Sequence, residues 1–190
     1  MDKHKMISDL MDQYGTSVLH LAYSYVRNRQ TAEDLTQEIF LKCFEKLDTY
    51  RGDSGLQTWL YRVASNHCKD YLKSWYFRKT HVTAFISGFF KDSQPGPEEQ
   101  FLQNDEKYQL QDALFNLPIK YREILFLYYF QECSQKEIGA ICSLNVNTVK
   151  SRLTRARELL KKILDERSYE YGGSVEADEK PAVKGRTSGF

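Results

Sequence analysis

The sequence of 190 residues lacks an apolar run that is long enough to cross a membrane. Its densest apolar stretch covers residues 124–130, whereas a membrane-spanning helix needs about 20 apolar residues. The N-terminus also has no apolar signal region and no cleavage site. We therefore expect a cytoplasmic protein with no direct membrane insertion.

The sequence is equally poor in the residue patterns of metal sites and catalytic sites. Its four cysteines form no C-x-x-C pair, and the neighbours His67 and Cys68 are too close in sequence to be good ligands of one metal. The cysteines are predicted to be reduced thiols in a core or at an interface. Because a phosphate-binding loop and a paired nucleophile and base are also missing, we expect no metal, no cofactor and no enzymatic activity.

Apolar residues recur at helical spacing almost throughout, and no segment alternates as a strand does. This pattern predicts an all-α fold with two small helical domains, over residues 1–80 and 105–167, joined by a flexible linker over 81–104. Within the linker, KDSQPGPEEQ has two prolines around a glycine, while the apolar FISGFF before it either packs locally or enters a groove of a partner. The polar residues 168–190 are expected to be a disordered tail.

Residues 134–165 have the pattern of a helix-turn-helix. Ser134, followed three residues later by Glu137, is a capping box that begins a short helix. The turn over 143–145 ends this helix, and its last residue is suited to cap a longer helix over 146–165. A short helix, a three-residue turn and a longer basic helix match the DNA-binding motif.

Three residues inside this motif fit its geometry. Gly139 allows the two helices to approach closely, and Val149 is predicted to be buried in the angle between them. Ser143 occupies a position where the motif often has glycine, so it costs some stability if its backbone is left-handed.

The polar face of the longer helix is strongly cationic. Residues 146–167 contain seven lysines and arginines against three acidic residues, and Val149, Leu153 and Ala156 form the apolar stripe on the other side. A solvated surface helix would also explain this charge, but the second helix of a helix-turn-helix enters the major groove. We therefore predict DNA contacts from Asn147, Thr148, Lys150, Ser151, Thr154 and Arg155.

The segment over residues 31–48 is predicted to be a helix that has Thr31 as its N-cap and an acidic outer face. Asp34 and Glu38 lie on this face, and Leu41 lies among the acidic residues. An exposed leucine ringed by negative charge suits an interface with a basic partner, although a single surface leucine is also ordinary.

The next predicted helix, over 55–78, has a cationic face. Basic residues with aromatic neighbours are suited to bind unpaired bases, because the charges follow the phosphates while the rings stack. The alternative is that the aromatic residues belong to a helical core, which we favour for Trp59 and leave open for 75–77. His67 is predicted to pack on the apolar side. The candidate nucleic-acid residues are Arg62, Asn66, Lys69, Lys73, Trp75, Tyr76, Arg78 and Lys79.

Two long strings resemble the extracytoplasmic-function sigma factors of bacterial RNA polymerase. AEDLTQEIFLKCFEKLDTYRGDSGLQTWLYRVASNHCKDYL resembles the core of the second region of the family, and LPIKYREILFLYYFQECSQKEIGAICSLNVNTVKSRLTRARELLKK resembles its fourth region. Together the matches cover roughly residues 7–80 and 106–165. The resemblance implies a monomer that binds core RNA polymerase and promoter DNA, and that an anti-sigma factor holds inactive.

The resemblance also implies roles for the three candidate faces. Asp34, Gln37, Glu38 and Leu41 match positions that bind the largest polymerase subunit. Arg62, Asn66, Lys69 and the segment from Lys73 to Thr80, expected as a loop, match positions that melt and capture the −10 element. The six residues of 147–155 match positions that read the −35 element, although Asn147 and Lys150 depart from the usual residues and leave the promoter sequence open.

Two rival functions fit less of the sequence. A conventional regulator, which binds operator DNA as a dimer through the same helix-turn-helix, leaves the acidic face and the basic-aromatic helix without a purpose. A nucleic-acid enzyme lacks a catalytic site. We therefore predict a sigma factor that directs promoter-specific transcription initiation.

Overall fold

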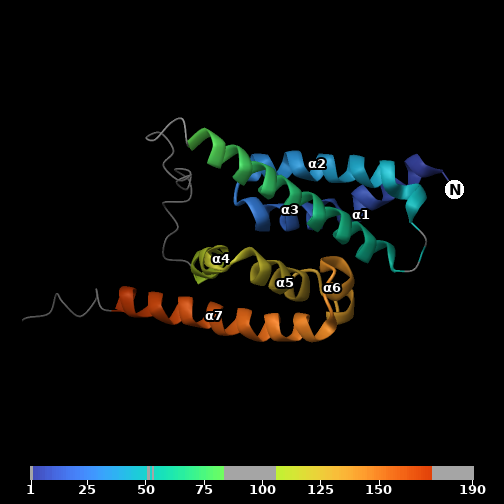
Figure 1. Ribbon diagram of the computed structural model, residues 1–190. Helices are drawn as coiled ribbons and strands as arrows, with labels where there is room; N and C mark the ends of the chain where they lie inside the picture. The colour runs from blue at the N-terminus through green and yellow to red at the C-terminus, as the bar shows by residue number, and fades with distance from the viewer. Residues whose placement is uncertain (1, 51, 53, 84–105, 173–190) are drawn as a thin grey trace, which may run out of the picture.

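The computed structural model describes the backbone of residues 2–50, 52, 54–83 and 106–172, and their side chains outside 77–83, 106–108 and 167–172. Within these ranges the regular secondary structure is entirely helical, as predicted (Figure 1). The elements are α1 (Lys3–Val26), α2 (Arg29–Lys46), the short 3-10 helix η1 (Leu47–Thr49), α3 (Leu56–Thr83), α4 (Glu106–Asn116), α5 (Ile119–Tyr129), α6 (Gln135–Cys142) and α7 (Val146–Gly172).

Helices α1, α2 and α3 form a three-helix bundle in the N-terminal half of the chain. Leu35 and Ile39 of α2 are buried in this bundle, and Trp59 of α3 is buried as predicted. The predicted cap of α2 is wrong, because Asn28 and not Thr31 caps the helix. The side-chain oxygen of Asn28 accepts hydrogen bonds from both the backbone N–H and the hydroxyl of Thr31, which therefore lies in the first turn.

Helices α4 to α7 form the C-terminal half, in which α7 packs on α4, α5 and α6. The predicted capping box at the start of α6 is confirmed. Hydrogen bonds from the hydroxyl and backbone N–H of Ser134 lower the pKa of Glu137. At the start of α7, the Asn145 side chain accepts a hydrogen bond of 2.7 Å from the backbone N–H of Thr148, so Asn145 caps this helix as predicted.

The turn between α6 and α7 has the tight geometry that the sequence predicts. Ser143 has a φ of 56°, so a residue with a side chain occupies the left-handed conformation that favours glycine. A Cβ atom on Gly139 would lie 2.8 Å from the backbone oxygen of Leu144. Val149 is fully buried behind this contact. The helix-turn-helix therefore depends on the missing side chain at position 139.

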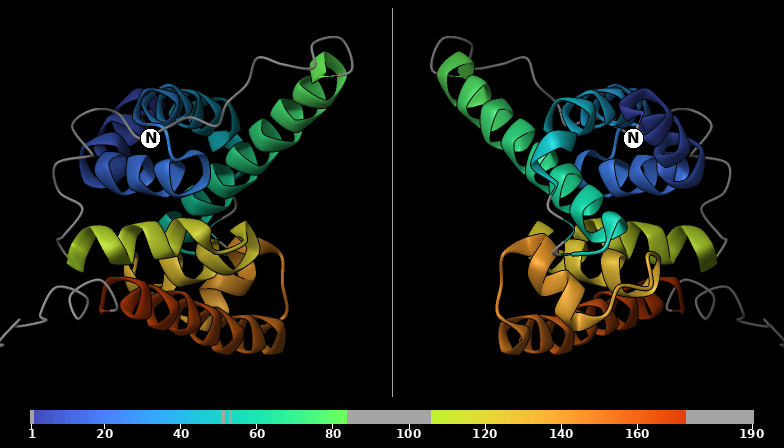
Figure 2. Two further views of the ribbon diagram at one scale, coloured as in Figure 1. Left: turned by 90° about the vertical axis from the view of Figure 1, so that its left-hand side faces the viewer. Right: turned by 90° about the vertical axis from the view of Figure 1, so that its right-hand side faces the viewer.

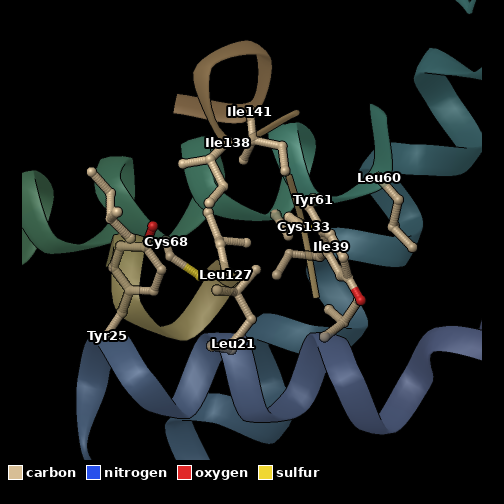
Figure 3. Close-up of a cluster of buried hydrophobic side chains, with 14 of the residues drawn as sticks. Leu21, Tyr25, Ile39, Leu60, Tyr61, Cys68, Leu127, Cys133, Ile138 and Ile141 are labelled. Atoms are coloured by element: carbon tan, nitrogen blue, oxygen red, sulfur yellow. The ribbon is translucent and has the colours of Figure 1, made fainter. Parts of the chain in front are cut away.

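The two halves of the chain pack against each other. Helix α3 contacts α6, and α1 contacts α5, so the bundle forms one layer and the C-terminal half lies beneath it (Figures 1 and 2). Figure 3 shows buried side chains from both halves in one cluster. Leu127 of α5 and Ile138 of α6 meet Leu21 of α1 and Cys68 of α3 there, and none of the four is exposed. The sequence did not predict this contact.

Two helices extend past the predicted ends of their domains. Helix α7 continues to Gly172, beyond the predicted end of the domain at residue 167. Residues 146–171 contain no glycine or proline to end the helix, and Gly172 is the first poor helix former along it. Helix α3 continues to Thr83. The rest of the predicted linker, including FISGFF, and the tail after Gly172 lie outside the described residues.

The four cysteines are free thiols, as predicted. Burial raises the pKa of Cys43, Cys68 and Cys133 to about 12 in each case, so these thiols are protonated at neutral pH and act as packing residues. Within the described ranges, no three His, Cys, Asp or Glu side chains are grouped as metal ligands. No described helix has both the length and the apolar character that a membrane span requires.

Candidate nucleic-acid and protein interfaces

The acidic face of α2 is exposed over its whole predicted extent. Asp34, Gln37, Glu38 and Leu41 are all exposed, whereas Leu35 and Ile39 on the other side are buried. Leu41 is 65 % exposed, the largest exposed fraction among the exposed large apolar side chains of the described residues. The helix thus presents a protruding leucine within a negative surface, the arrangement that a basic partner with an apolar pocket would bind.

His67 of α3 fixes one carboxylate of this face. It is buried, as predicted, and its Nε2 lies 2.7 Å from Oε2 of Glu38. Because a carboxylate only accepts, the ring N–H at Nε2 is the donor. Nδ1 of His67 is buried without a hydrogen-bond partner. The contact orients Glu38 and ties the acidic face to the helix that carries the cationic face.

The predicted cationic stripe of α3 is not uniformly exposed. Asn66 and Lys73 are exposed, and Lys73 forms a surface ion pair of 3.3 Å with Asp70. Arg62 is half-buried, and its Nε is buried without a hydrogen-bond partner. Lys69 is half-buried and pairs with an acidic residue of the C-terminal half. Asn66 and Lys73 therefore lie on the surface of α3, whereas neighbouring residues partly cover Arg62 and Lys69.

The C-terminal end of α3 projects past the rest of the bundle (Figure 2). Trp75 and Tyr76 lie on this projection and are 39 % and 60 % exposed, so they are surface residues. Their rings contact each other edge to face with 5.3 Å between the centroids. Such rings are available for stacking on bases. The side chains of Arg78 and Lys79 lie outside the described residues.

The partner of Lys69 is Glu123 of α5, a residue that sequence analysis did not single out. Glu123 is only 3 % exposed, and its Oε1 accepts two contacts from the N-terminal half. Nζ of Lys69 lies 2.6 Å away, and the hydroxyl of Tyr25 on α1 donates a hydrogen bond of 2.6 Å. The sequence did contain a signal for this burial. Glu123 lies four positions before the apolar Leu127, so both residues are on the same side of α5.

The surroundings of Glu123 are buried and lie between the halves. Burial, together with the Glu123 charge, raises the pKa of the Tyr25 hydroxyl well above its ordinary value. The same two causes raise the pKa of the Cys142 thiol on α6. Two further polar contacts also cross between the halves: Arg27 pairs with Asp112, and Tyr61 donates a hydrogen bond to Gln131.

Helix α7 lies on the side of the C-terminal half that is farther from the bundle (Figure 1), and its predicted DNA face is largely exposed. Asn147, Lys150, Ser151, Thr154 and Arg155 are exposed, and Thr148 is half-buried. The face is also ordered by local contacts. The hydroxyls of Ser151 and Thr154 donate to carbonyls one turn earlier, and Arg155 pairs with Glu158 at 2.9 Å. Thr148 donates its hydroxyl to the cap residue Asn145, so this side chain also supports the helix start.

Comparison with known protein families gives two matches in chain order. Residues 10–75 match the family model described as Sigma-70 region 2, and residues 107–160 match the model described as Sigma-70, region 4. The first range contains α2 and most of α3, and the second contains the helix-turn-helix.

Individual relatives match across both regions. The chain is 32 % identical over 164 residues to the extracytoplasmic-function RNA polymerase sigma factor SigW of Bacillus subtilis, covering 83 % of this chain and 88 % of that relative. It is 33 % identical to the RNA polymerase sigma-H factor of Pseudomonas aeruginosa, covering 82 % and 84 %. A crystal structure of the sigma factor RpoE with the anti-sigma factor NepR from Bartonella quintana has a similar fold, with a TM-score of 0.68, 23 % identity, and coverage of 85 % and 98 %.

Proposed function

Because this chain belongs to the extracytoplasmic-function group of the sigma-70 family, we propose that its three exposed faces divide the work of promoter recognition. The chain is a sigma factor: it binds core RNA polymerase and directs promoter-specific transcription initiation. Sigma factors are not enzymes, so the polymerase supplies the chemistry. The observation that carries the proposal is that one chain contains both a region 2 and a region 4, each with an exposed face for nucleic acid.

In this proposal residues 1–80 bind polymerase and the −10 element, and residues 105–167 bind the −35 element, with 81–104 as the connection. The acidic face of α2, made of Asp34, Gln37, Glu38 and Leu41, binds the largest polymerase subunit. Its support is the exposed leucine among carboxylates and the ordering of Glu38 by His67. Charge attraction speeds association, while the leucine supplies apolar contact.

Helix α3 captures the −10 element as unpaired DNA. Arg62, Lys69, Lys73, Arg78 and Lys79 follow the phosphates, Asn66 contacts a base edge, and Trp75 and Tyr76 stack on bases. The exposure of both rings at the projecting end of α3 supports this division. Stacking on aromatic side chains contributes about 1–3 kcal/mol per base.

Helix α7 reads the −35 element in the major groove. Asn147, Thr148, Lys150, Ser151, Thr154 and Arg155 belong to its first turns, which is the part of a recognition helix that reaches base edges. Asn147 offers a bidentate pair to adenine, and Arg155 offers one to guanine. Lys150 acts as a point charge for phosphate or for a guanine edge.

The proposed location, oligomeric state and partners of the chain follow from its binding to polymerase. Polymerase binding places the chain in the cytoplasm as a monomer when free, in contrast to a conventional regulator, which would dimerise on an operator. Since a similar solved structure holds an anti-sigma factor, a partner of that kind is part of the proposal. No cofactor is required.

The test is run-off transcription from a pool of genomic fragments with sigma-free core polymerase. Discrete start sites are expected only when the chain is added. Asn66→Ala and Arg155→Ala should each reduce these products about 5- to 150-fold, because each removes base contacts of about 1–3 kcal/mol. Lys162→Ala is the matched control, since this exposed lysine lies farther along α7 and forms a surface ion pair with Glu166.

Tight binding of the free chain to duplex DNA, without any polymerase-dependent start sites, would contradict the proposal. It would favour the conventional regulator instead.

A further inference from the structure

The packing of the two halves is incompatible with reading both promoter elements at once. Elements centred near −10 and −35 lie about 25 base pairs apart, which is about 85 Å of B-form DNA at about 3.4 Å per pair. Helix α7, with 27 residues, is only about 40 Å long at about 1.5 Å per residue. In the closed chain Lys69 of the −10 face touches α5, directly beneath the bundle. The halves must therefore separate when the promoter is bound.

The closed arrangement also occupies part of the −10 face. Lys69 is assigned to the DNA backbone, yet its ammonium group is 2.6 Å from Glu123. Helix α6 packs on α3, so the first helix of the DNA-binding motif covers a side of the helix that captures −10 DNA. The acidic face of α2 and the DNA face of α7 stay exposed. The closed chain can therefore meet polymerase or duplex DNA, but it cannot present a complete −10 surface.

We propose that Glu123 is an internal latch, which holds the free chain closed by taking the place of a DNA phosphate at Lys69. This inference rests on the proposed function for the role of Lys69 and deepens it by naming an autoinhibitory contact. The carboxylate imitates the ligand that Lys69 binds in the open state, namely a phosphate oxygen. Tyr25 holds the same carboxylate oxygen, so the latch engages two helices of the N-terminal half.

A buried ion pair is suited to a reversible latch. Burying two charges costs much of what their attraction returns, so such a pair adds little net stability but strongly disfavours arrangements in which one partner is left alone. The apolar contacts of Leu127 with Leu21, drawn in Figure 3, supply the adhesion. When the halves separate, Glu123 and Lys69 both become hydrated, and Lys69 can bind phosphate. Polymerase or promoter DNA can therefore open the latch without breaking a strong lock.

The latch has a quantitative consequence for binding. When only an open fraction of the chain is competent, the apparent Kd equals the intrinsic Kd divided by that fraction. Since only the open chain presents the complete −10 surface, a change that raises the open fraction tenfold must lower the apparent Kd for unpaired −10 DNA tenfold. This equality links a distance measurement on the free chain to an affinity measured independently.

The experiment uses the full chain with donor and acceptor dyes on unnatural amino acids at exposed positions 13 and 162. Single-molecule energy transfer then reports the separation of the halves. Glu123→Lys places a second ammonium group against Lys69, so we expect at least about a tenfold larger open fraction and an equal gain in affinity for an unpaired −10 oligonucleotide. Glu123→Gln, which keeps the shape and removes the charge, should have a smaller effect in the same direction.

Glu166→Lys is the matched control, because it makes the same change of charge at an exposed position of the C-terminal half. It should leave the open fraction unchanged. If Glu123→Lys fails to fold, as judged by circular dichroism, Glu123→Gln decides the question. A folded Glu123 variant that keeps the wild-type distance distribution overturns the latch. Run-off transcription by the wild-type chain separately tests the proposed function, so failure of one is distinguishable from failure of the other.

Discussion

Asp34→Arg is expected to lower the affinity of the chain for core polymerase at least about 100-fold. The substitution reverses a charge on the acidic face, and like charges at an interface cost several kcal/mol. Leu41→Ala should cost about 2 kcal/mol, or about 30-fold in Kd, because it removes the one large apolar side chain that protrudes from this face. Fluorescence anisotropy with core polymerase measures both effects.

The control for this pair is Met11→Ala on α1. Met11 is 49 % exposed, so it is another large apolar side chain on the surface of the same bundle. Its loss should leave the Kd within about twofold, and all three variants should unfold at the wild-type temperature because the altered side chains are exposed. Equal Kd values for Leu41→Ala and Met11→Ala would remove the assignment of the polymerase-binding face to α2.

Gly139→Ala is expected to destabilise the C-terminal half by about 1–3 kcal/mol. The added Cβ would lie 2.8 Å from the backbone oxygen of Leu144, and a backbone atom cannot move aside as the end of a side chain can. The turn would have to open, which shifts Val149 out of its buried position. Chemical denaturation measures the change in the free energy of unfolding, and binding to −35 DNA should weaken in parallel.

Gly15→Ala is the matched control, since the same substitution is made inside a helix. No neighbouring atom lies within 4 Å of a Cβ atom at position 15. Alanine is the better helix former, so this variant should gain roughly 0.5–1 kcal/mol. We therefore expect the free energy of unfolding to fall for Gly139→Ala and to rise for Gly15→Ala. A stability gain at both would show that the approach of α6 to the turn is not a constraint.

Much of the fold was predictable because its signals are local. The capping box at Ser134 and the cap at Asn145 depend on residues three positions apart, and the structure confirms both. The burial of Val149 follows from helical periodicity alone. Asn28 was missed because Thr31 is also a favourable N-cap residue and is followed by acidic residues. The choice between them depends on where α1 ends, which the local pattern does not fix to the residue.

The contact between the halves left no such signal. Glu123 and Lys69 are 54 positions apart in the sequence, and nothing in either helix names the other as a partner. Periodicity correctly placed Lys69 on the same stripe as Asn66, but it carries no information on which members a distant helix covers. The sequence therefore predicts the candidate faces of α2, α3 and α7. Which residues of the α3 face are covered in the free chain depends on tertiary packing, which the sequence pattern does not show.

The central claim is that α3 and α7 read two promoter elements at the same time, in a complex with polymerase. Photo-crosslinking amino acids at positions 76 and 147, on a promoter found by run-off transcription, test it most directly. Crosslinks are expected near −10 from position 76 and near −35 from position 147, about 25 base pairs apart and dependent on core polymerase. Crosslinks from both positions to one short duplex site, formed equally well without polymerase, would contradict it.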